Sequence, residues 1–364
     1  MQIWFRVPRA GTEPVVERRC PRCGGAQCHV HQHERQRRIV DWKLDTIDQL
    51  RVKCSRCGKT WTCRPEGIAA GLHRTSGVVA FGVLLYALGL SYSAAAAALR
   101  ALTGAGGKTT VYRDVVRAGD RARRLHDRRK GGGVRFLGVD GTGQKMKGGR
   151  TGVAFAVDAE KGLLLGVELV EEENERQVVR FVKQLCRDYG VEVLITDEHG
   201  SYAKATRARS VQVAHRLCEA HWKKSKQLRL RNLRTEAKER GHQRLVRDLD
   251  TLRRLVRDRP DDAPRRIRRI HERYLEHRCP PLGRPWSLGY HMRMLALHLL
   301  DTWDRVGGEG PATNNTAERL IGLLLKIRSK TMRGFAKREN IPRFVHLMAY
   351  LWENRRNCPL RALC

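Results

Sequence analysis

The chain has 364 residues, which is too long for one small hydrophobic core and predicts two or three domains. Its 72 lysines and arginines outnumber its 38 aspartates and glutamates and give a formal net charge of +34. Such an excess favours a polyanionic partner, because neutralising phosphates releases condensed counterions, whereas a solubilising surface needs far less charge. We therefore predict that the chain binds nucleic acid.

The eleven cysteines argue against a disulfide framework, because no signal peptide is evident and four of them form two Cys-x-x-Cys pairs. Residues 77–99 carry no charge and are long enough to span a bilayer, so a membrane helix is an alternative. The sequence Gly89-Leu90-Ser91-Tyr92-Ser93 interrupts this run, and we expect two short packed helices instead. We predict a cytoplasmic, nucleoid-associated protein that does not enter the membrane.

Residues 1–66 predict a zinc ribbon. The pairs Cys20/Cys23 and Cys54/Cys57 are each followed by glycine, so both thiolates of a turn can face one point. Four such ligands complete a closed tetrahedral Zn²⁺ site, which stabilises a fold and leaves no position open for a substrate. Cysteines unrelated to a metal are the alternative. Short strands are expected at residues 38–42, 50–53 and 60–62.

Residues 67–132 predict a helix-turn-helix domain. Helical patterns lie at residues 78–88, 92–102 and 109–125, with glycines between them. The last helix is basic, and in a helix-turn-helix domain this helix enters the major groove. A purely structural three-helix bundle is the alternative. The predicted DNA contacts in this domain are Lys108, Thr110, Tyr112, Arg113 and Arg117.

In residues 133–221 the pattern of apolar residues changes to one that is typical of β-strands. Strand-like runs lie at residues 134–140, 151–157 and 163–170. Glycine turns at 141–143 and 160–162 are expected to join them into an antiparallel meander. A helical pattern covers 176–189, and the apolar run at 191–196 is typical of a buried parallel strand. This order predicts a ribonuclease-H-like core, in which the first and fourth strands are neighbours.

Two aspartates end the first and fourth of these strands, Asp140 and Asp197, so the predicted topology brings them together. Glu318 lies near the start of a helical pattern in residues 311–364, the predicted last part of the same core. Carboxylate oxygens suit Mg²⁺, and two such ions stabilise both the entering and the leaving oxygen of a phosphodiester displacement. Capping of the following turn is the alternative role for each aspartate. The three acids together in so basic a chain favour catalysis.

The helix of Glu318 continues into a basic segment whose side chains can contact phosphates. A solvated basic surface is the alternative for each of these side chains. Two further lysines follow the strand that ends at Asp140. The predicted DNA contacts in these two segments are Lys145, Lys147, Lys326, Arg328, Lys330 and Arg333.

Residues 222–310 are predicted to be an all-helical insertion between the two parts of the core. Leucines recur at helical spacing and prolines divide the segment into pieces, which argues against a disordered basic arm. We expect this insertion to bind DNA or a second protomer. The predicted fold is a multidomain α+β protein with a zinc ribbon, a helix-turn-helix and a ribonuclease-H-like α/β core interrupted by an all-α insertion.

Several segments are similar to those of one enzyme family. They are Asp140-Gly141-Thr142, the strand that ends at Asp197, and Thr313-Asn314-Asn315-Thr316-Ala317-Glu318. With these segments the chain resembles the insertion-sequence DDE transposases over about residues 134–351. Cys218-Glu219-Ala220-His221 looks like the Cys-x-x-His element of the Mutator-like group. Without the resemblance, this pair would be a core cysteine and a histidine at a helix start.

The resemblance implies a transposase of a bacterial or archaeal insertion sequence that cleaves element-end DNA and joins it to target DNA, using Mg²⁺ or Mn²⁺. It implies catalytic metal ligation by Asp140, Asp197 and Glu318. The implied auxiliary residues are Cys218, His221, Asn314 and Asn315. The implied partners are double-stranded DNA and further copies of the chain, as a homodimer or a higher oligomer.

Two other functions remain as alternatives. A sequence-specific DNA-binding regulator with a non-catalytic core is disfavoured by the three retained carboxylates. A structure-specific nuclease that lacks strand transfer is disfavoured by the predicted end-recognition domains and by the Thr-Asn-Asn-x-x-Glu sequence at 313–318.

Overall fold

The computed structural model describes residues 5–170, 174–207, 213–281, 285–326, 334–356 and 358–363. The fold is mixed α+β, and the chain divides into two compact units. The first comprises residues 1–129, 144–151 and 322–364, and the second comprises residues 130–143 and 152–321. Among the described residues, no helix is long and apolar enough to span a membrane. The predicted division into five segments stays a prediction.

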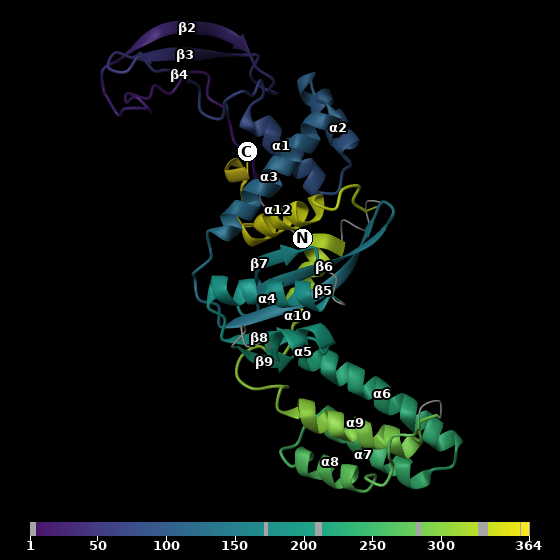
Figure 1. The fold of residues 1–364 in the computed structure, drawn as a ribbon. Coiled ribbons are helices and arrows are strands. Elements are labelled where there is room, and N and C mark those ends of the chain that lie inside the picture. The colour runs from purple at the N-terminus through teal and green to yellow at the C-terminus, as the bar shows by residue number, and fades with distance from the viewer. Residues whose placement is uncertain are drawn as a thin grey trace. The chain divides into compact units, whose positions relative to one another are not determined.

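The first unit contains a three-stranded antiparallel sheet of β2 (Cys28–Arg38), β3 (Thr46–Cys54) and β4 (Thr60–Cys63), drawn in purple and blue in Figure 1. Strands β3 and β4 contain the predicted runs, but the prediction of a strand at 38–42 was wrong. The edge strand β2 lies earlier and is exposed at nearly every position, so no alternation of apolar residues marks it in the sequence. A short strand β1 (Phe5–Arg6) pairs in parallel with β10 (Cys358–Pro359).

Three helices follow this sheet, α1 (Ser76–Ala87), α2 (Tyr92–Thr103) and α3 (Lys108–Asp127), all within two residues of their predicted bounds. Side chains cap the first two helices, because Thr75 accepts the amide of Val78 and Ser91 accepts that of Ala94. Helix α2 ends at Gly104, whose φ of 69° favours glycine. The uncharged run at 77–99 is therefore two capped helices.

Helix α3 packs against the C-terminal helix α12 (Asn340–Glu353) through a buried polar network. Nδ1 of His126 lies 2.8 Å from Nδ1 of His346, so one of the two rings donates the hydrogen bond. Nε2 of His126 lies 3.4 Å from the carboxylate of Glu353, and Arg129 contacts the same oxygen at 2.6 Å. Burial, reinforced by the neighbouring His126, lowers the pKa of His346 to about 3, so this ring is neutral at physiological pH.

The second unit is built on a five-stranded sheet in the order β7-β6-β5-β8-β9. Its strands are β5 (Phe136–Met146), β6 (Gly149–Asp158), β7 (Leu163–Glu168), β8 (Val193–Thr196) and β9 (Ala214–Leu217). Strands β6 and β7 are antiparallel, whereas β5, β8 and β9 run parallel to one another. The prediction that the first and fourth strands are neighbours is confirmed, because β5 pairs with β8.

The predicted glycine turn at 141–143 was wrong, because β5 continues through these residues to Met146. Neither Gly141 nor Gly143 has a positive φ, so both fit extended backbone. The turn between β5 and β6 instead lies at residues 147–148, and Gly148 has a φ of 89°, which favours glycine. Asp140 therefore lies within a long strand rather than at its end.

The two faces of this sheet carry different side chains. Leu137 and Leu194 belong to the hydrophobic core that includes Phe181 of α4 (Glu175–Tyr189), the crossover helix between β7 and β8. Because side chains alternate along a strand, Phe136 and Ile195 point to the opposite face and form a smaller cluster there. Helix α5 (Gly200–Arg207) follows β8 and contacts α4. The face opposite α4 is the one that carries the candidate site.

The segment predicted as a helical insertion consists of α6 (Glu219–Glu239), α7 (Gln243–Asp258), α8 (Ala263–Glu272) and α9 (Leu288–Trp303). These green helices of the second unit lie together in Figure 1 and share one apolar core, to which Leu230, Leu249 and Leu299 contribute. The alternative of a disordered basic arm was therefore wrong. The chain then enters α10 (Asn315–Ile321), which continues as a π-helical turn, η1 (Gly322–Lys326).

Candidate active site

The parallel register of β5 and β8 brings Asp140 and Asp197 together. Gly138 lies opposite Ile195, so Asp140 and Asp197 each lie two residues beyond a paired position, at the same end of neighbouring strands. Neighbouring strands lie about 4.8 Å apart, and side chains alternate between the two faces along a strand. Asp140 in β5 therefore points to the side of Phe136, away from α4, and Asp197 directly follows β8, whose Ile195 lies on that side.

Backbone amides hold one oxygen of each aspartate. The amide of Gly141 donates to Oδ1 of Asp140 at 2.8 Å, and the amide of His199 donates to Oδ1 of Asp197 at 3.0 Å. The turn-capping role considered as an alternative is thus real for Asp197, whereas Asp140 lies within β5 and no turn follows it. A carboxylate has two oxygens and several lone pairs, so these bonds orient the group and still leave it able to bind a cation.

Asn314 places the helix of Glu318 on this same face of the sheet. Asn314 is buried, and its side-chain Nδ2 donates to the backbone carbonyl of Val139 at 2.8 Å. The backbone carbonyl of Asn314 accepts a hydrogen bond from the backbone amide of Glu318 at 3.2 Å. Its Oδ1 lies against the Cα of Gly138, where any side chain would collide with it. The helix can approach the strand this closely because residue 138 has no Cβ.

Glu318 lies beside the Cys-x-x-His element. Its Oε1 is 3.1 Å from Nε2 of His221, and the sulfur of Cys218 completes a cluster whose ligand atoms all lie within 4.8 Å of one another. Cys218 is the buried N-cap residue of α6, and His221 is in the first turn of that helix. The backbone amide of Asn314 donates to the Cys218 sulfur at 3.2 Å. Asn315, the neighbouring auxiliary candidate, is exposed at the start of α10.

Asp140 carries the electrostatic signature of crowded carboxylates. Burial raises the pKa of Asp140 to about 6, and the negative charges of Asp197 and Glu318 both add to this effect. The Gly141 amide and His221 act in the opposite direction but do not cancel it. The other two predicted acids therefore both act on Asp140, and a cation among the three would relieve this repulsion.

An ion pair that was not predicted from the sequence links α6 to the segment after β8. Nζ of Lys226 is fully buried and lies 2.6 and 2.7 Å from the two carboxylate oxygens of Glu198, which also lies 3.2 Å from Nε2 of His298. Burial raises the pKa of Glu198, but hydrogen bonds from His298 and Lys226 outweigh it and hold the value at about 2. Burial lowers the pKa of Lys226, so lost hydration offsets part of the attraction.

A signal for this pair was present in the sequence. Lys226 occupies the apolar stripe of α6, between the buried residues Trp222 and Leu230 at helical spacing. A lysine at such a position needs a carboxylate partner, because a buried unpaired ammonium is very costly. The position of Lys226 on the apolar face of α6 predicts that an acidic partner exists. Only the tertiary structure identifies this partner as Glu198, the residue after Asp197.

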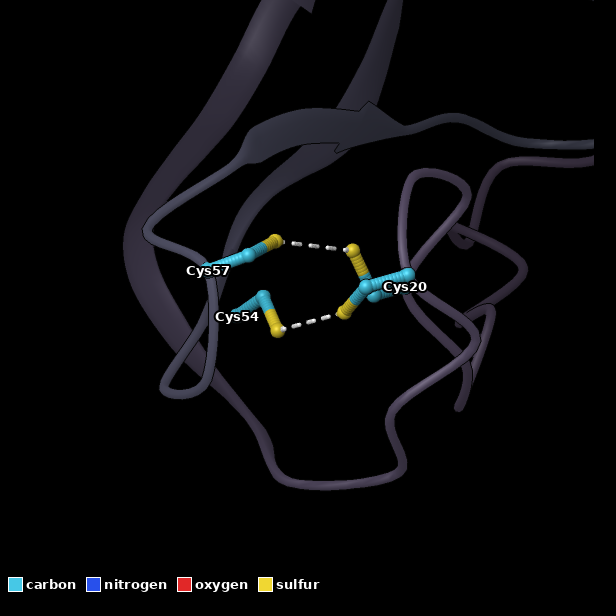
Figure 2. A group of neighbouring side chains, drawn as sticks. Cys20, Cys54 and Cys57 are labelled. Carbon is cyan, nitrogen blue, oxygen red and sulfur yellow. Dashed lines mark hydrogen bonds between the residues drawn. The ribbon is translucent and has the colours of Figure 1, made fainter.

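The first unit contains the four predicted cysteine ligands in one cluster, shown in Figure 2. The sulfurs of Cys20 and Cys57 lie 3.6 Å apart, and those of Cys23 and Cys54 lie 3.7 Å apart. Tetrahedral thiolate coordination with metal–sulfur bonds of about 2.3 Å requires sulfurs about 3.8 Å apart. The backbone amide of Cys57, assisted by that of Arg56, lowers the pKa of Cys54 to about 6, which favours the thiolate. The donor set and spacing fit Zn²⁺.

The predicted DNA contacts of α3 fall into two groups. Lys108, Arg113 and Arg117 are exposed, and Thr110 is half-buried. Tyr112 instead packs edge-to-face on Tyr92 with ring centroids 5.4 Å apart, and its hydroxyl lies 3.4 Å from the side-chain amide of Asn340. These contacts give Tyr112 a packing role within the first unit.

The remaining predicted DNA contacts lie in the β5–β6 hairpin and after α10. Lys145, Lys147 and Lys326 are exposed. Arg328, Lys330 and Arg333 lie outside the described residues. Exposure is required for a phosphate contact, and a solvated basic surface has it as well.

Comparisons with known proteins give little further information. No protein-family model matches the sequence, and no curated protein matches it. Among solved structures, the chain is similar to the crystal structure of the catalytic core domain of BIV integrase. The match has 17% sequence identity and a TM-score of 0.20, and covers 55% of this chain and 100% of that chain. So low a TM-score carries no argument, and the interpretation of the site depends on its own geometry.

Proposed function

We propose that the chain is a DDE-type transposase of an insertion sequence, which binds double-stranded DNA and catalyses metal-dependent strand cleavage and strand transfer. One observation carries this proposal. The charges of Asp197 and Glu318 both act on Asp140, although the three acids are far apart in the sequence, because β5 pairs with β8 and Asn314 anchors the start of α10 to β5. In a chain with a net charge of +34, three converging carboxylates fit phosphate chemistry on a nucleic acid.

The acids suit a pair of hard divalent ions, Mg²⁺ or Mn²⁺, which would stabilise the entering and leaving oxygens of an in-line displacement. Asp140 and Asp197 would hold them from the sheet, and Glu318 would do so from α10. His221 would orient the Glu318 carboxylate through their 3.1 Å contact. Cys218 and Asn314 would position the two helices, because the sulfur accepts the Asn314 amide. Asn315, exposed beside Glu318, would contact DNA.

The other parts of the chain would bind and organise the DNA. We infer that the four-cysteine cluster holds structural Zn²⁺ and that β2–β4 form a zinc ribbon. Helices α2 and α3 would act as a helix-turn-helix, with Lys108, Arg113 and Arg117 on phosphates or base edges. Helices α6–α9 would be an insertion in a ribonuclease-H-like core that contacts DNA or a second protomer. Two element ends require at least two copies of the site, so a homodimer or larger oligomer is expected.

Cleavage of DNA that carries the element ends tests the proposal. The DNA flanking the gene supplies candidate inverted repeats for duplex substrates. We expect Mg²⁺-dependent cleavage by the full chain, and a loss of at least about a hundredfold in Asp140→Asn, Asp197→Asn and Glu318→Gln. DNA binding should persist, because each change replaces a carboxylate with an amide of the same shape. Asp261→Asn, which changes an exposed aspartate before α8, is the matched control and should remain active.

The outcomes separate the proposal from its alternatives. Full cleavage by Asp140→Asn or Asp197→Asn would remove the catalytic assignment. Specific binding without cleavage in Mg²⁺ or Mn²⁺ would favour a DNA-binding regulator. Cleavage without joining of the cut end to target DNA would favour a nuclease.

A further inference from the structure

We infer that Cys218, His221 and Glu318 form a binding site for one thiophilic divalent ion, with Zn²⁺ as the fitting example. The site is separate from the four-cysteine cluster, which lies in the other unit. A thiol sulfur, an imidazole nitrogen and a carboxylate oxygen are the ligand types of zinc sites that keep a fourth position open. Their ligand atoms all lie within 4.8 Å of one another.

The distance between His221 and Glu318 suits zinc with little movement. Nε2 of His221 and Oε1 of Glu318 lie 3.1 Å apart. Two such ligands on a tetrahedral zinc ion, each at about 2.0–2.2 Å, would lie about 3.4 Å apart. Cys218 and His221 are three residues apart at the start of α6, so their side chains lie on the same side of its first turn. Two elements, α6 and α10, therefore already supply three ligands.

The surroundings of Cys218 support a ligand role for its sulfur. The residue is fully buried, and its sulfur accepts the backbone amide of Asn314 at 3.2 Å. A hydrogen bond of this kind fixes the direction of a metal-binding sulfur, as outer contacts do in metal sites generally. Asn314 is itself anchored to the carbonyl of Val139, so the sulfur is held by the sheet rather than by a loose loop.

The other two ligands leave an entry path. The side chain of His221 is 38% exposed and that of Glu318 is 43% exposed, so an ion can reach the cluster from solvent and keep water in its fourth position. Zinc prefers sulfur and nitrogen ligands, whereas Mg²⁺ prefers oxygen alone. The sulfur, nitrogen and oxygen ligands of this cluster therefore disfavour Mg²⁺, the ion that Asp140 and Asp197 suit.

Zinc at this site would take Glu318 away from the catalytic acids. The same carboxylate cannot keep its full geometry for Mg²⁺ while it is bound to zinc beside His221. We therefore expect Zn²⁺ to inhibit Mg²⁺-dependent strand cleavage. This consequence rests on the proposed function, but zinc binding itself does not.

Zinc stoichiometry of the full chain tests the site. After dialysis against buffered Zn²⁺, we expect two equivalents in the natural protein and one each in Cys218→Ser and His221→Gln. Cys279→Ser, which removes an exposed thiol elsewhere, is the matched control and should keep two. Circular dichroism verifies that each variant is folded, and two different ligand variants prevent one misfolded protein from deciding the result. One equivalent in the natural protein, or two in folded Cys218→Ser, would overturn the inference.

A cleavage assay in Mg²⁺ with added buffered Zn²⁺ tests the consequence separately. We expect inhibition over the same Zn²⁺ concentrations that fill the second site. If zinc binds as expected but the chain cleaves no DNA, the proposed function fails and the site stands. If the chain cleaves DNA but holds a single zinc, the proposed function stands and this site is wrong.

Discussion

At the scale of single residues, Asp140 is held in surroundings that disfavour its charge. Its pKa of about 6 in the folded protein lies above the ordinary value of 3.8, because it is buried and near Asp197 and Glu318. The unfolded chain therefore releases this proton first as the pH rises. The folded protein loses stability between about pH 4 and pH 6 and does not regain it at higher pH. A catalytic cation would remove this penalty.

Asp140→Asn should therefore stabilise the metal-free protein at pH 7, by about 1–3 kcal/mol, because the amide carries no charge. Thermal unfolding at pH 7 with a chelator measures this gain, which should shrink as the pH is lowered toward 4. Added Mg²⁺ should raise the melting temperature of the natural protein but not of the variant. A variant that is less stable than the natural protein at pH 7 would contradict the account of Asp140.

The three acids could be selected as candidates from the sequence because their positions follow from local patterns. Asp140 and Asp197 follow apolar strand-like runs, and Glu318 starts a helical pattern, so each was visible without tertiary structure. The partner of a buried side chain is different, because it depends on how distant elements pack. Lys226 was detectable as a misfit on an apolar helix stripe, but its partner Glu198 was not.

At the scale of elements, the approach of α10 to β5 depends on Gly138. Gly138→Ala should push Asn314 away from the strand and displace Glu318, which follows Asn314 by one turn. We expect a stability loss of about 1–3 kcal/mol together with a loss of Mg²⁺-dependent cleavage larger than any loss of DNA binding. Gly166→Ala in β7 is the control, because its methyl group would press only on the end of the flexible Leu185 side chain, at 3.0 Å, and would make ordinary contacts of 3.5 and 3.7 Å with the Phe181 ring. Equal cleavage by both variants would show that α10 does not depend on this contact.

The packing of α3 on α12 predicts a pH dependence of a different sign. His346 is neutral in the folded protein, with a pKa of about 3, whereas an unfolded histidine titrates near 6.5. The contribution of His346 to stability is complete above about pH 6.5 and is lost as the pH falls toward 3. Between pH 7 and pH 5 the loss should be about 2 kcal/mol.

His346→Asn should reduce this loss, because the amide can take the place of Nδ1 beside His126 and does not titrate in this range. Denaturant unfolding at pH 7 and pH 5, followed by hydrogen exchange in α3 and α12, measures the difference. His29→Asn, in the exposed strand β2, should leave the pH dependence unchanged. A pH dependence that is identical in His346→Asn and the natural protein would contradict this assignment.

Element boundaries were predicted well where end signals are clear and poorly where they are absent. Helices α1–α3 lie within two residues of their expected bounds because glycines and helix-capping residues mark the joins between them. Strand β2 was misplaced because an exposed edge strand needs no apolar alternation. The glycines at 141–143 predicted a turn. Glycine permits a turn but does not require one, and β5 stays extended through these residues.

At the scale of the whole molecule, the order of the first four strands of the sheet followed from the sequence of elements. Three strands, a crossover helix and a further strand allow few arrangements, because connections are short and crossovers have a fixed hand. The arrangement of α6–α9 could not be predicted, because many packings of amphipathic helices bury the same leucines. The grouping of Cys218, His221 and Glu318 has the same origin, since two helices from different segments must meet to form it.

The three-stranded sheet β2–β4 should depend on a metal ion bound by the four cysteines. The apolar cluster of Ile39, Ile47 and Ile68 beside this sheet is small, so we expect a metal cross-link between the two cysteine turns to supply much of its stability. Removal of zinc by a chelator should increase hydrogen exchange strongly in β3 and leave β5 and β8 nearly unchanged. DNA binding should weaken at the same time. Unchanged protection of β3 after complete zinc removal would contradict a structural role for the four cysteines.

The central claim is that Asp140, Asp197 and Glu318 meet at one divalent-metal site. Diffraction from crystals of the full chain soaked in Mn²⁺, with the anomalous signal of manganese, tests it most directly. We expect an anomalous peak between Asp140 and Asp197, with carboxylate oxygens at about 2.0–2.3 Å and Glu318 turned toward it. Mn²⁺ bound only elsewhere, at concentrations that support cleavage, would contradict the claim.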